Sequence, residues 1–121
     1  MMRDYCPSFP GPGESEPNNS FAQANGPLCS GKDYSGLHND ADDYFRFSSA
    51  ASGLITVNLT TSAPDAQLVL YDAGFVLRGH RGGPPFVITY TGPAGVYYVR
   101  VFTACTPSCP NAPYSLRVTY P

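Results

Sequence analysis

The sequence predicts an all-β chain, an antiparallel β-sandwich (jelly-roll-like) of about 7–9 strands preceded by an extended N-terminal arm. From residue 43 onward, apolar and polar residues alternate with a period of two, which is typical of half-buried strands. Short apolar runs recur about every ten residues, and glycine and proline turns separate them. No helical period persists past residue 25. Together these observations indicate a sandwich.

The N-terminal segment differs in composition from the rest of the chain. Residues 1–20 are rich in proline and glycine, which favours an extended arm without regular structure. Only Ser20–Ala24 predicts a helical turn, with Ser20 or Asn19 as its cap. We therefore expect an arm over residues 1–20 and a single sandwich domain over residues 21–121.

Seven strands are expected along the sandwich domain, each with one apolar face. In the run Leu54–Thr60, for example, Ile55, Val57 and Leu59 share the face that points into the core. The turn after the third strand contains Asp72, whose carboxylate is expected to shape the chain before Gly74. The expected strands are Tyr44–Phe47, Leu54–Thr60, Ala66–Tyr71, Phe75–Leu77, Phe86–Tyr90, Val96–Phe102 and Tyr114–Tyr120.

Length and composition narrow the class of protein. A chain of 121 residues is expected to form one domain with a core of its own. The net charge of −2 argues against a nucleic-acid-binding domain, which needs a basic face. No apolar run approaches the length of a membrane-spanning helix, and no signal peptide is visible at the N-terminus. The chain reads as a mature domain or an excised fragment.

Acidic residues gather in one segment. Residues 14–43 carry a net charge of −5, whereas residues 44–121 carry +3. Clustered carboxylates repel one another unless a cation neutralises them, and a hard cation such as Ca²⁺ is one solution. A solvated acidic loop is the alternative. The charged residues of the segment are Glu14, Glu16, Lys32, Asp33, Asp40, Asp42 and Asp43.

The four cysteines favour an oxidising compartment. They allow three pairings, of which we favour Cys6–Cys29 and Cys105–Cys109 because each would close a proline-rich segment. A zinc site is the alternative, but the CxxC spacing and neighbouring histidines of such sites are missing. Disulfides together with few charged residues indicate a secreted, extracellular domain.

One strand presents a candidate binding face. In Val96–Phe102 the apolar set should face the core, which leaves Tyr98, Arg100 and Phe102 on the outer face. Aromatic and arginine side chains are the types that anchor interfaces. The alternative is that Tyr98 and Phe102 pack under the Cys105–Cys109 loop.

Other polar residues suggest no catalytic site. His38 and His80 are expected in surface loops, with His80 at a hairpin tip beside Arg78 and Arg81, and no Ser/His/Asp set is indicated. Two glycosylation sequons begin at Asn18 and Asn58. Asn58 would lie on the outward face of its strand.

Four blocks of sequence, in order, resemble the bacterial pre-peptidase C-terminal domain family. The resemblance spans residues 14–120, nearly the whole chain, and it implies a non-catalytic β-sandwich that accompanies secreted peptidases and other extracellular proteins. The blocks are Glu14-Ser-Glu16-Pro17-Asn18-Asn19-Ser20 with Ala22 and Ala24, Asp40-Ala-Asp42-Asp43-Tyr44-Phe45-Arg46-Phe47, Leu70-Tyr71-Asp72-Ala73-Gly74, and Pro93–Val101 followed by Tyr114-Ser115-Leu116.

The resemblance also implies a calcium site. The collagen-binding domains of bacterial collagenases are similar members of the family and bind calcium through an arm and a second cluster before the first strand. The arm ligands correspond here to Glu14, Glu16, Asn18 and Asn19, and the second cluster to Ser35, Asp40 and Asp43. Such an ion would hold the arm against the sandwich. Asp42 is a further candidate ligand, and its alternative role is to start the strand or to pair with an arginine.

Two functions follow as expectations. The first is a non-catalytic, calcium-stabilised extracellular module that binds protein or polysaccharide, either substrate or matrix, for a secreted enzyme. The second is a structural subunit that assembles with copies of itself into a fibre or surface layer through its arm and edge strands. An enzyme in its own right is not expected. The collagen-specific pattern is not evident, so collagen binding does not follow.

Overall fold

The computed structural model of the chain describes residues 20–38, 42–63, 65–103 and 112–121. These residues form eight strands and one short helical turn. The expected boundary of the arm, at residue 20, adjoins residues 1–19, which lie outside the described part. The elements are η1 (Phe21–Gln23), β1 (Lys32–Leu37), β2 (Asp42–Ser49), β3 (Gly53–Thr61), β4 (Gln67–Asp72), β5 (Leu77–Arg81), β6 (Phe86–Gly92), β7 (Gly95–Phe102) and β8 (Pro113–Thr119).

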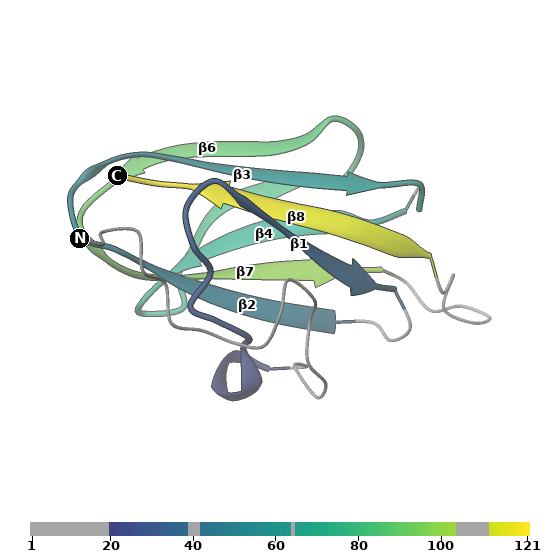
Figure 1. Cartoon of the computed structure of the whole chain (residues 1–121), viewed down its shortest axis with the longest axis horizontal. Coiled ribbons are helices and arrows are strands. Elements are labelled where there is room, and N and C mark those ends of the chain that lie inside the picture. The colour runs from purple at the N-terminus through teal and green to yellow at the C-terminus, as the bar shows by residue number, and fades with distance from the viewer. Residues whose placement is uncertain (1–19, 39–41, 64, 104–111) are drawn as a thin grey trace.

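The strands make two four-stranded antiparallel sheets packed face to face (Figure 1). The first sheet has the order β1-β8-β3-β6 and the second has the order β2-β7-β4-β5. Apart from the hairpin of β4 and β5, successive strands alternate between the sheets, as in a jelly roll. The expected all-β sandwich is therefore confirmed. In the described part of the chain, no helix is long and apolar enough to cross a membrane.

The core lies between the sheets and is made by the alternate residues that the sequence pattern indicates. Strand β3 buries one residue in two, and β7 and β8 do the same. Burial of these side chains is the main stabilising contribution to such a fold. The residues that were expected inside and are buried include Phe45, Phe47, Ile55, Val57, Leu59, Leu68, Leu70, Tyr97, Val99, Val101, Tyr114, Leu116 and Val118.

Stacked aromatic rings close the core toward the C-terminus of the chain. The ring of Phe47 stacks on Tyr97 with centroids 5.4 Å apart and on Tyr120 at 4.8 Å. The hydroxyl of Tyr97 donates to the carbonyl of Pro93 at 2.6 Å, and that of Tyr120 donates to the carbonyl of Leu28 at 2.6 Å. Each phenol thus packs its ring against the core, Tyr97 fully buried and Tyr120 partly, and still satisfies its hydroxyl.

Strand β1 was not expected from the sequence. Its residues are mostly polar, and only Tyr34 is buried. It forms because it is an edge strand whose backbone pairs with β8, from Lys32 opposite Val118 to Leu37 opposite Pro113. An edge strand can pair through its backbone while few of its side chains are buried, so the apolar–polar alternation that identifies inner strands is weak here.

The expected strand Phe75–Leu77 was misplaced. Phe75 and Val76 belong to a turn, and the strand β5 begins at Leu77 and runs to Arg81. Arg78, His80 and Arg81 therefore lie in a strand and not at a hairpin tip, although His80 is exposed as expected. Pairing with β4 accounts for the shift, since it aligns Leu68 with Arg81.

Both edges of the second sheet have a neighbour. Beside β2, the amide of Asn25 donates to the carbonyl of Tyr44 at 2.9 Å, and Leu28 donates to Arg46 at 2.9 Å. Asn25 and Phe45 form a parallel bridge there. At the other edge, Nε of Arg81 donates to the carbonyl of Val87 in β6 at 3.1 Å. Covered edges limit pairing with foreign strands.

Candidate functional site

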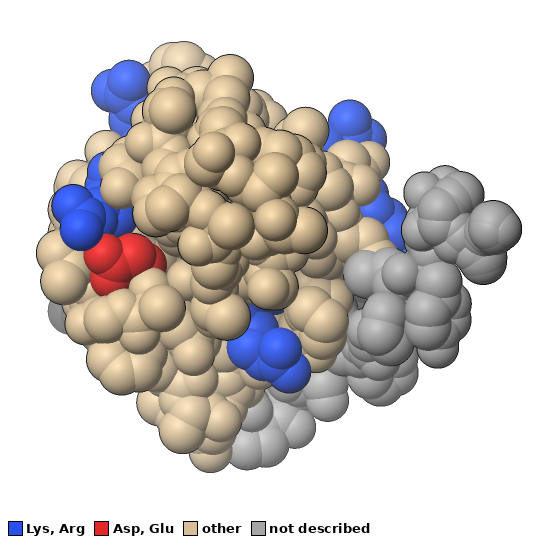
Figure 2. Space-filling view, turned by 90° about the vertical axis from the view of Figure 1, so that its left-hand side faces the viewer, with Lys and Arg blue, Asp and Glu red and all other residues tan. Residues whose placement is uncertain are grey.

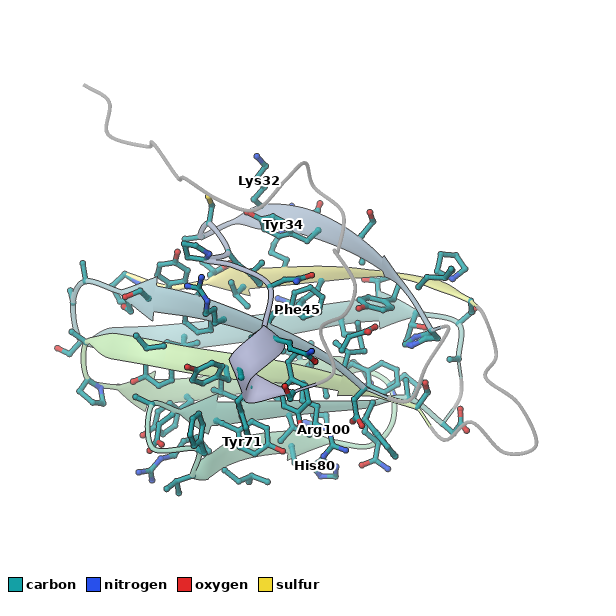
Figure 3. The ribbon with its side chains drawn as sticks, turned by 90° about the horizontal axis from the view of Figure 1, so that it is seen from below. Lys32, Tyr34, Phe45, Tyr71, His80 and Arg100 are labelled. Carbon is teal, nitrogen blue, oxygen red and sulfur yellow. The ribbon has the colours of Figure 1, made fainter. Side chains whose placement is uncertain are left out.

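The outer face of the sheet β2-β7-β4-β5 carries the predicted binding residues. Tyr98, Arg100 and Phe102 alternate along β7 with buried core residues, and all three are half-buried. They therefore lie on the outward side, as expected from the sequence. Figure 3 looks toward this sheet, with η1 in front of it and Tyr71 and Arg100 labelled nearby.

The ring of Phe21, in η1, lies against four aromatic rings of this sheet and its β4–β5 turn. The distances between ring centroids are 4.3 Å to Phe75, 4.8 Å to Tyr44, 5.0 Å to Tyr71 and 5.3 Å to Tyr98. Edge-on and tilted contacts at these distances are favourable beyond simple burial. We call these five side chains, together with Arg100 and Phe102, the aromatic face.

Sequence reasoning missed the role of Phe21. The one signal in the sequence is that Phe21 is the only large apolar residue of the expected turn Ser20–Ala24. That signal does not say which surface the ring covers. The expected turn is itself confirmed as η1, over Phe21–Gln23.

Arg100 is held in place by an ion pair and by rings. Its Nε donates to Oδ1 of Asp42 at 2.6 Å, and its guanidinium lies 4.7 Å from the ring centroid of Phe102 and 5.9 Å from that of Tyr44. Burial alone would lower the pKa of Arg100, but hydrogen bonds to Asp42 and Tyr71 outweigh it and raise the pKa. Burial raises the pKa of the Tyr44 phenol. Asp42 thus takes its expected alternative role as partner of an arginine.

Asp72 organises the turn between β4 and β5 that carries Phe75 of the aromatic face. Asp72 Oδ1 accepts the backbone N–H groups of Gly74 at 2.9 Å and Val76 at 3.1 Å, and Oδ2 accepts from Arg78 at 2.9 Å. The Val76 hydrogen bond is the largest of the effects that lower the pKa of Asp72; desolvation opposes it, and the bonds from Arg78 and Gly74 add to the lowering. The expected turn role of Asp72 is confirmed. Phe75 takes the left-handed conformation, at a φ of 63°, which costs energy for a bulky residue.

Three consecutive apolar side chains, two in this turn and one at the start of β5, are about half exposed. Phe75 is 51% exposed, Val76 50% and Leu77 55%. Figure 2 shows the end of the sandwich on which the β2–β3 and β6–β7 turns lie, and the centre of this end is uncharged, with Lys and Arg groups around it. The acidic atoms visible there sit beside a basic group. A surface with apolar groups and few charges is typical of an interaction site.

The predicted calcium ligands fall mostly outside the described residues. Glu14, Glu16, Asn18, Asn19 and Asp40 all lie there. Within the described part, no group of three or more His, Cys, Asp or Glu side chains is placed to hold a metal ion.

The structure describes two predicted calcium ligands, on different sheets. Ser35 is exposed on β1, whereas the carboxylate of Asp43 is buried on β2. Oxygen donors suit Ca²⁺ chemically. Ser35, however, is on the outward side of its strand, whereas Asp43 faces the interior.

Asp43 belongs to a buried polar cluster that the sequence did not indicate. The hydroxyl of Tyr114 donates to Oδ2 of Asp43 at 2.7 Å. The ring of Tyr114 packs on that of His38 at 4.7 Å, and Nε2 of His38 lies 2.8 Å from Oγ1 of Thr61. The expectation that His38 is a surface residue is wrong, since only 1% of it is exposed. Its backbone N–H donates to the carbonyl of Ala112 at 2.8 Å, and the Thr61 hydroxyl gives its buried ring a hydrogen-bond partner.

The remaining predicted residues are only partly described. Cys29 is disulfide-bonded, but its partner lies outside the described residues, so the pairings Cys6–Cys29 and Cys105–Cys109 stay predictions. Asn58 lies on the outward face of β3, as expected. The Asn18 sequon and the Cys105–Cys109 loop lie outside the described part.

Solved structures share this fold. The pre-peptidase C-terminal domain of a Bacillus anthracis collagenase aligns with a TM-score of 0.64 and 15% identity, over 74% of this chain and 90% of that one. The periplasmic g-type lysozyme inhibitor PliG of Aeromonas hydrophila aligns with a TM-score of 0.57 and 18% identity, over 72% of this chain and 81% of that one. No protein-family model and no curated protein matches the chain. The sequence resemblance to the pre-peptidase C-terminal domain family is thus matched by a likeness of fold to one such domain.

Proposed function

We propose that this chain, which shares its fold with a pre-peptidase C-terminal domain, is a non-catalytic extracellular module that binds a protein partner through its aromatic face. The partner would be a substrate or matrix protein of a secreted enzyme. Two proteins that share the fold have names that involve protein targets, a collagenase domain and a lysozyme inhibitor. At such low identity these names support a class of partner and no particular one.

The observation that carries the proposal is the gathering of four aromatic rings around Phe21 on the outer face of one sheet, where Arg100 lies over Tyr44 and Phe102. Tyrosine, phenylalanine and arginine are enriched at protein interfaces, because each combines apolar area with a polar or charged group or a flat ring. Strands hold the side chains of Tyr44, Tyr71 and Tyr98 in fixed positions. A partner would therefore meet a surface that is already ordered, which lowers the entropy lost on binding.

Two probes test the proposal directly. The full chain is sedimented with fibrillar collagen and, separately, titrated with a g-type lysozyme. We expect one probe to bind the wild type and Tyr98→Ala to weaken that binding at least tenfold, which corresponds to about 1.4 kcal/mol for one interface aromatic.

Thr119→Ala is the matched control, because Thr119 is exposed on the other sheet. It should bind as the wild type does. Equal binding by Tyr98→Ala would contradict the aromatic face as the site, and failure of both probes would remove these two partners from the proposal.

We also propose that calcium holds the arm to the sandwich. The support is the net charge of −5 over residues 14–43, together with oxygen side chains at the expected spacing. The proposed ligands are Glu14, Glu16, Asn18, Asn19, Asp40, Asp43 and the backbone oxygen of Ser35.

Thermal melts with excess Ca²⁺ and with chelator test this proposal. An ion at a hundredfold excess over its Kd stabilises the native state by about 2.7 kcal/mol, which raises Tm by several degrees in a domain of this size. Glu16→Ala should abolish the shift, whereas Asp33→Ala should keep it, since Asp33 pairs with Arg117 on the surface. A shift of the same size in Glu16→Ala would refute the arm ligands.

Self-assembly is the second proposed function. Within one chain, Asn25–Leu28 already pairs with the edge strand β2. The same pairing between copies would build a fibre or a surface layer. Light scattering measures the mass directly, and a monomer over a wide range of concentration would refute assembly.

A further inference from the structure

The outward face of the sheet β1-β8-β3-β6 is hollowed by two shallow depressions that meet. The first has a volume of ≈ 350 Å³ and the second of ≈ 330 Å³, and Asn58 and Thr60 line both. Asp33, Ser115 and Arg117 complete the first. The second is completed by Leu59, Thr61, Pro84, Pro85, Phe86 and Val87. We call the two together the sheet groove.

Strand register explains why the groove is long. Asp33 on β1 is opposite Arg117 on β8, which is opposite Asn58 on β3, which is opposite Val87 on β6. The row thus crosses all four strands. At about 4.8 Å between neighbouring strands, it extends for about 14 Å. A groove of this length suits a run of several linked rings better than one small molecule.

One half of the groove is polar and carries no net charge. The guanidinium of Arg117 donates to both carboxylate oxygens of Asp33, from Nε at 2.8 Å and from Nη2 at 3.0 Å. A bidentate pair orients both groups and cancels their charges. The amide of Asn58 and the hydroxyls of Thr60 and Ser115 add neutral donors and acceptors beside it.

The other half is apolar. Pro84 and Pro85, both exposed, precede β6, and Val87 lies on its outward side. Proline rings and a valine side chain present apolar C–H surfaces. The groove therefore changes from hydrogen-bonding groups to apolar groups along its length, and Asn58 and Thr60 lie where the halves meet.

We propose that the sheet groove binds an uncharged oligosaccharide chain. Sugar rings combine hydroxyl edges with apolar C–H faces, which matches a groove that has both kinds of wall. Neutral polar groups on rigid strands are already oriented for hydroxyls, so little order has to be gained on binding. An acidic sugar chain finds no uncompensated cation among the residues that line the groove, since Asp33 neutralises Arg117.

This site is separate from the one in the proposed function, because the groove and the aromatic face belong to different sheets. The module would then hold a protein on one side and a glycan on the other. The test of the groove is therefore independent of what the aromatic face binds.

Nuclear magnetic resonance titration of the unglycosylated full chain tests the proposal. The probes are cellohexaose and chitohexaose, both uncharged, and the acidic hexagalacturonate. We expect at least one uncharged probe to shift the amides of β3, β8 and the start of β6 at millimolar concentration. Asn58→Ala should weaken that binding about tenfold or more, because it removes hydrogen bonds from the centre of the groove.

Two control variants make the result specific. Thr119→Ala lies on the same sheet outside the groove, and Tyr98→Ala lies on the aromatic face, so both should bind as the wild type does. Three results would overturn the proposal: no shifts with either uncharged probe, shifts that map to β7 instead, or equal binding by hexagalacturonate. Unchanged binding by Asn58→Ala, with its fold verified by its spectrum, would overturn it too.

Discussion

At the scale of single residues, His38 shows how the end of a strand creates an interior polar site. Its ring is buried against the ring of Tyr114, and its Nε2 lies 2.8 Å from Oγ1 of Thr61. Burial lowers the pKa of His38, and the charge of Asp65 opposes this effect. The folded chain therefore keeps this imidazole neutral at a pH where the unfolded chain already protonates it.

The chain should lose stability as the pH falls through the ordinary pKa of histidine. Above that pKa both states hold a neutral His38, and below it the unfolded state binds a proton that the folded state resists, so unfolding is favoured until the lowered pKa is reached. The slope from this residue is at most about 1.4 kcal/mol per pH unit. Urea denaturation between about pH 7.5 and about pH 5 measures it.

His38→Gln is the variant that isolates this effect, because glutamine keeps a polar group near Thr61 and does not titrate. His80→Gln is the matched control, since His80 is exposed on β5. The pH slope should become smaller in the first variant only. An identical slope in wild type and His38→Gln would show that other groups cause the acid sensitivity.

At the scale of elements, the segment from η1 to Leu28 behaves as a strap over the second sheet. Phe21 anchors it on the aromatic face, and backbone hydrogen bonds fasten Asn25 and Leu28 to β2. Arg46 adds a hydrogen bond from Nη2 to the carbonyl of Gly26 at 3.3 Å. The strap covers the β2 edge and supplies Phe21 to the aromatic face.

Phe21→Ala should loosen this strap while the sandwich stays folded. The substitution removes four ring contacts, and a partly buried aromatic contributes about 1–3 kcal/mol through burial and ring geometry. Hydrogen exchange should become faster at the amides of Asn25 and Leu28, whose acceptors lie in β2.

Gln23→Ala is the control, because Gln23 is exposed on the same turn. It should leave the exchange of both amides nearly unchanged. Unaltered exchange in Phe21→Ala would mean that the backbone bonds hold the segment without the ring.

At the scale of the whole molecule, a single core joins the two sheets. The buried cluster includes residues of every strand of the first sheet and of β2, β4 and β7 in the second. Strands that are adjacent in a sheet are often distant in sequence, such as β1 and β8. A core of this kind is expected to unfold cooperatively.

Two leucines of the first sheet provide a test of this core. Leu116 on β8 is fully buried, whereas Leu54 on β3 is 57% exposed. Leu116→Ala should cost about 2–5 kcal/mol of unfolding free energy through lost burial and a cavity, and Leu54→Ala about 0.5 kcal/mol or less. Urea denaturation followed by circular dichroism measures both. Similar losses in the two variants would contradict the arrangement of the sheet.

The strands in the middle of each sheet could be predicted from the sequence alone. One face of each is buried and the other is outward, so Ile55, Val57 and Leu59 on β3 and Tyr97, Val99 and Val101 on β7 leave a period of two. The same alternation by itself assigns Tyr98, Arg100 and Phe102 to the outer face. Successive side chains of a strand point to opposite faces, so the order of apolar and polar residues in the sequence shows which face each residue takes.

Only the tertiary structure decided the features that depend on contacts between distant segments. β1 becomes a strand through pairing with β8, His38 is buried by Thr61 and Tyr114, and Phe21 meets rings from β2, β4 and β7. The sheet groove arises in the same way, from the register of four strands. Each of these features joins residues far apart in the chain, and periodicity within one segment carries no information about the partner that packing brings to it.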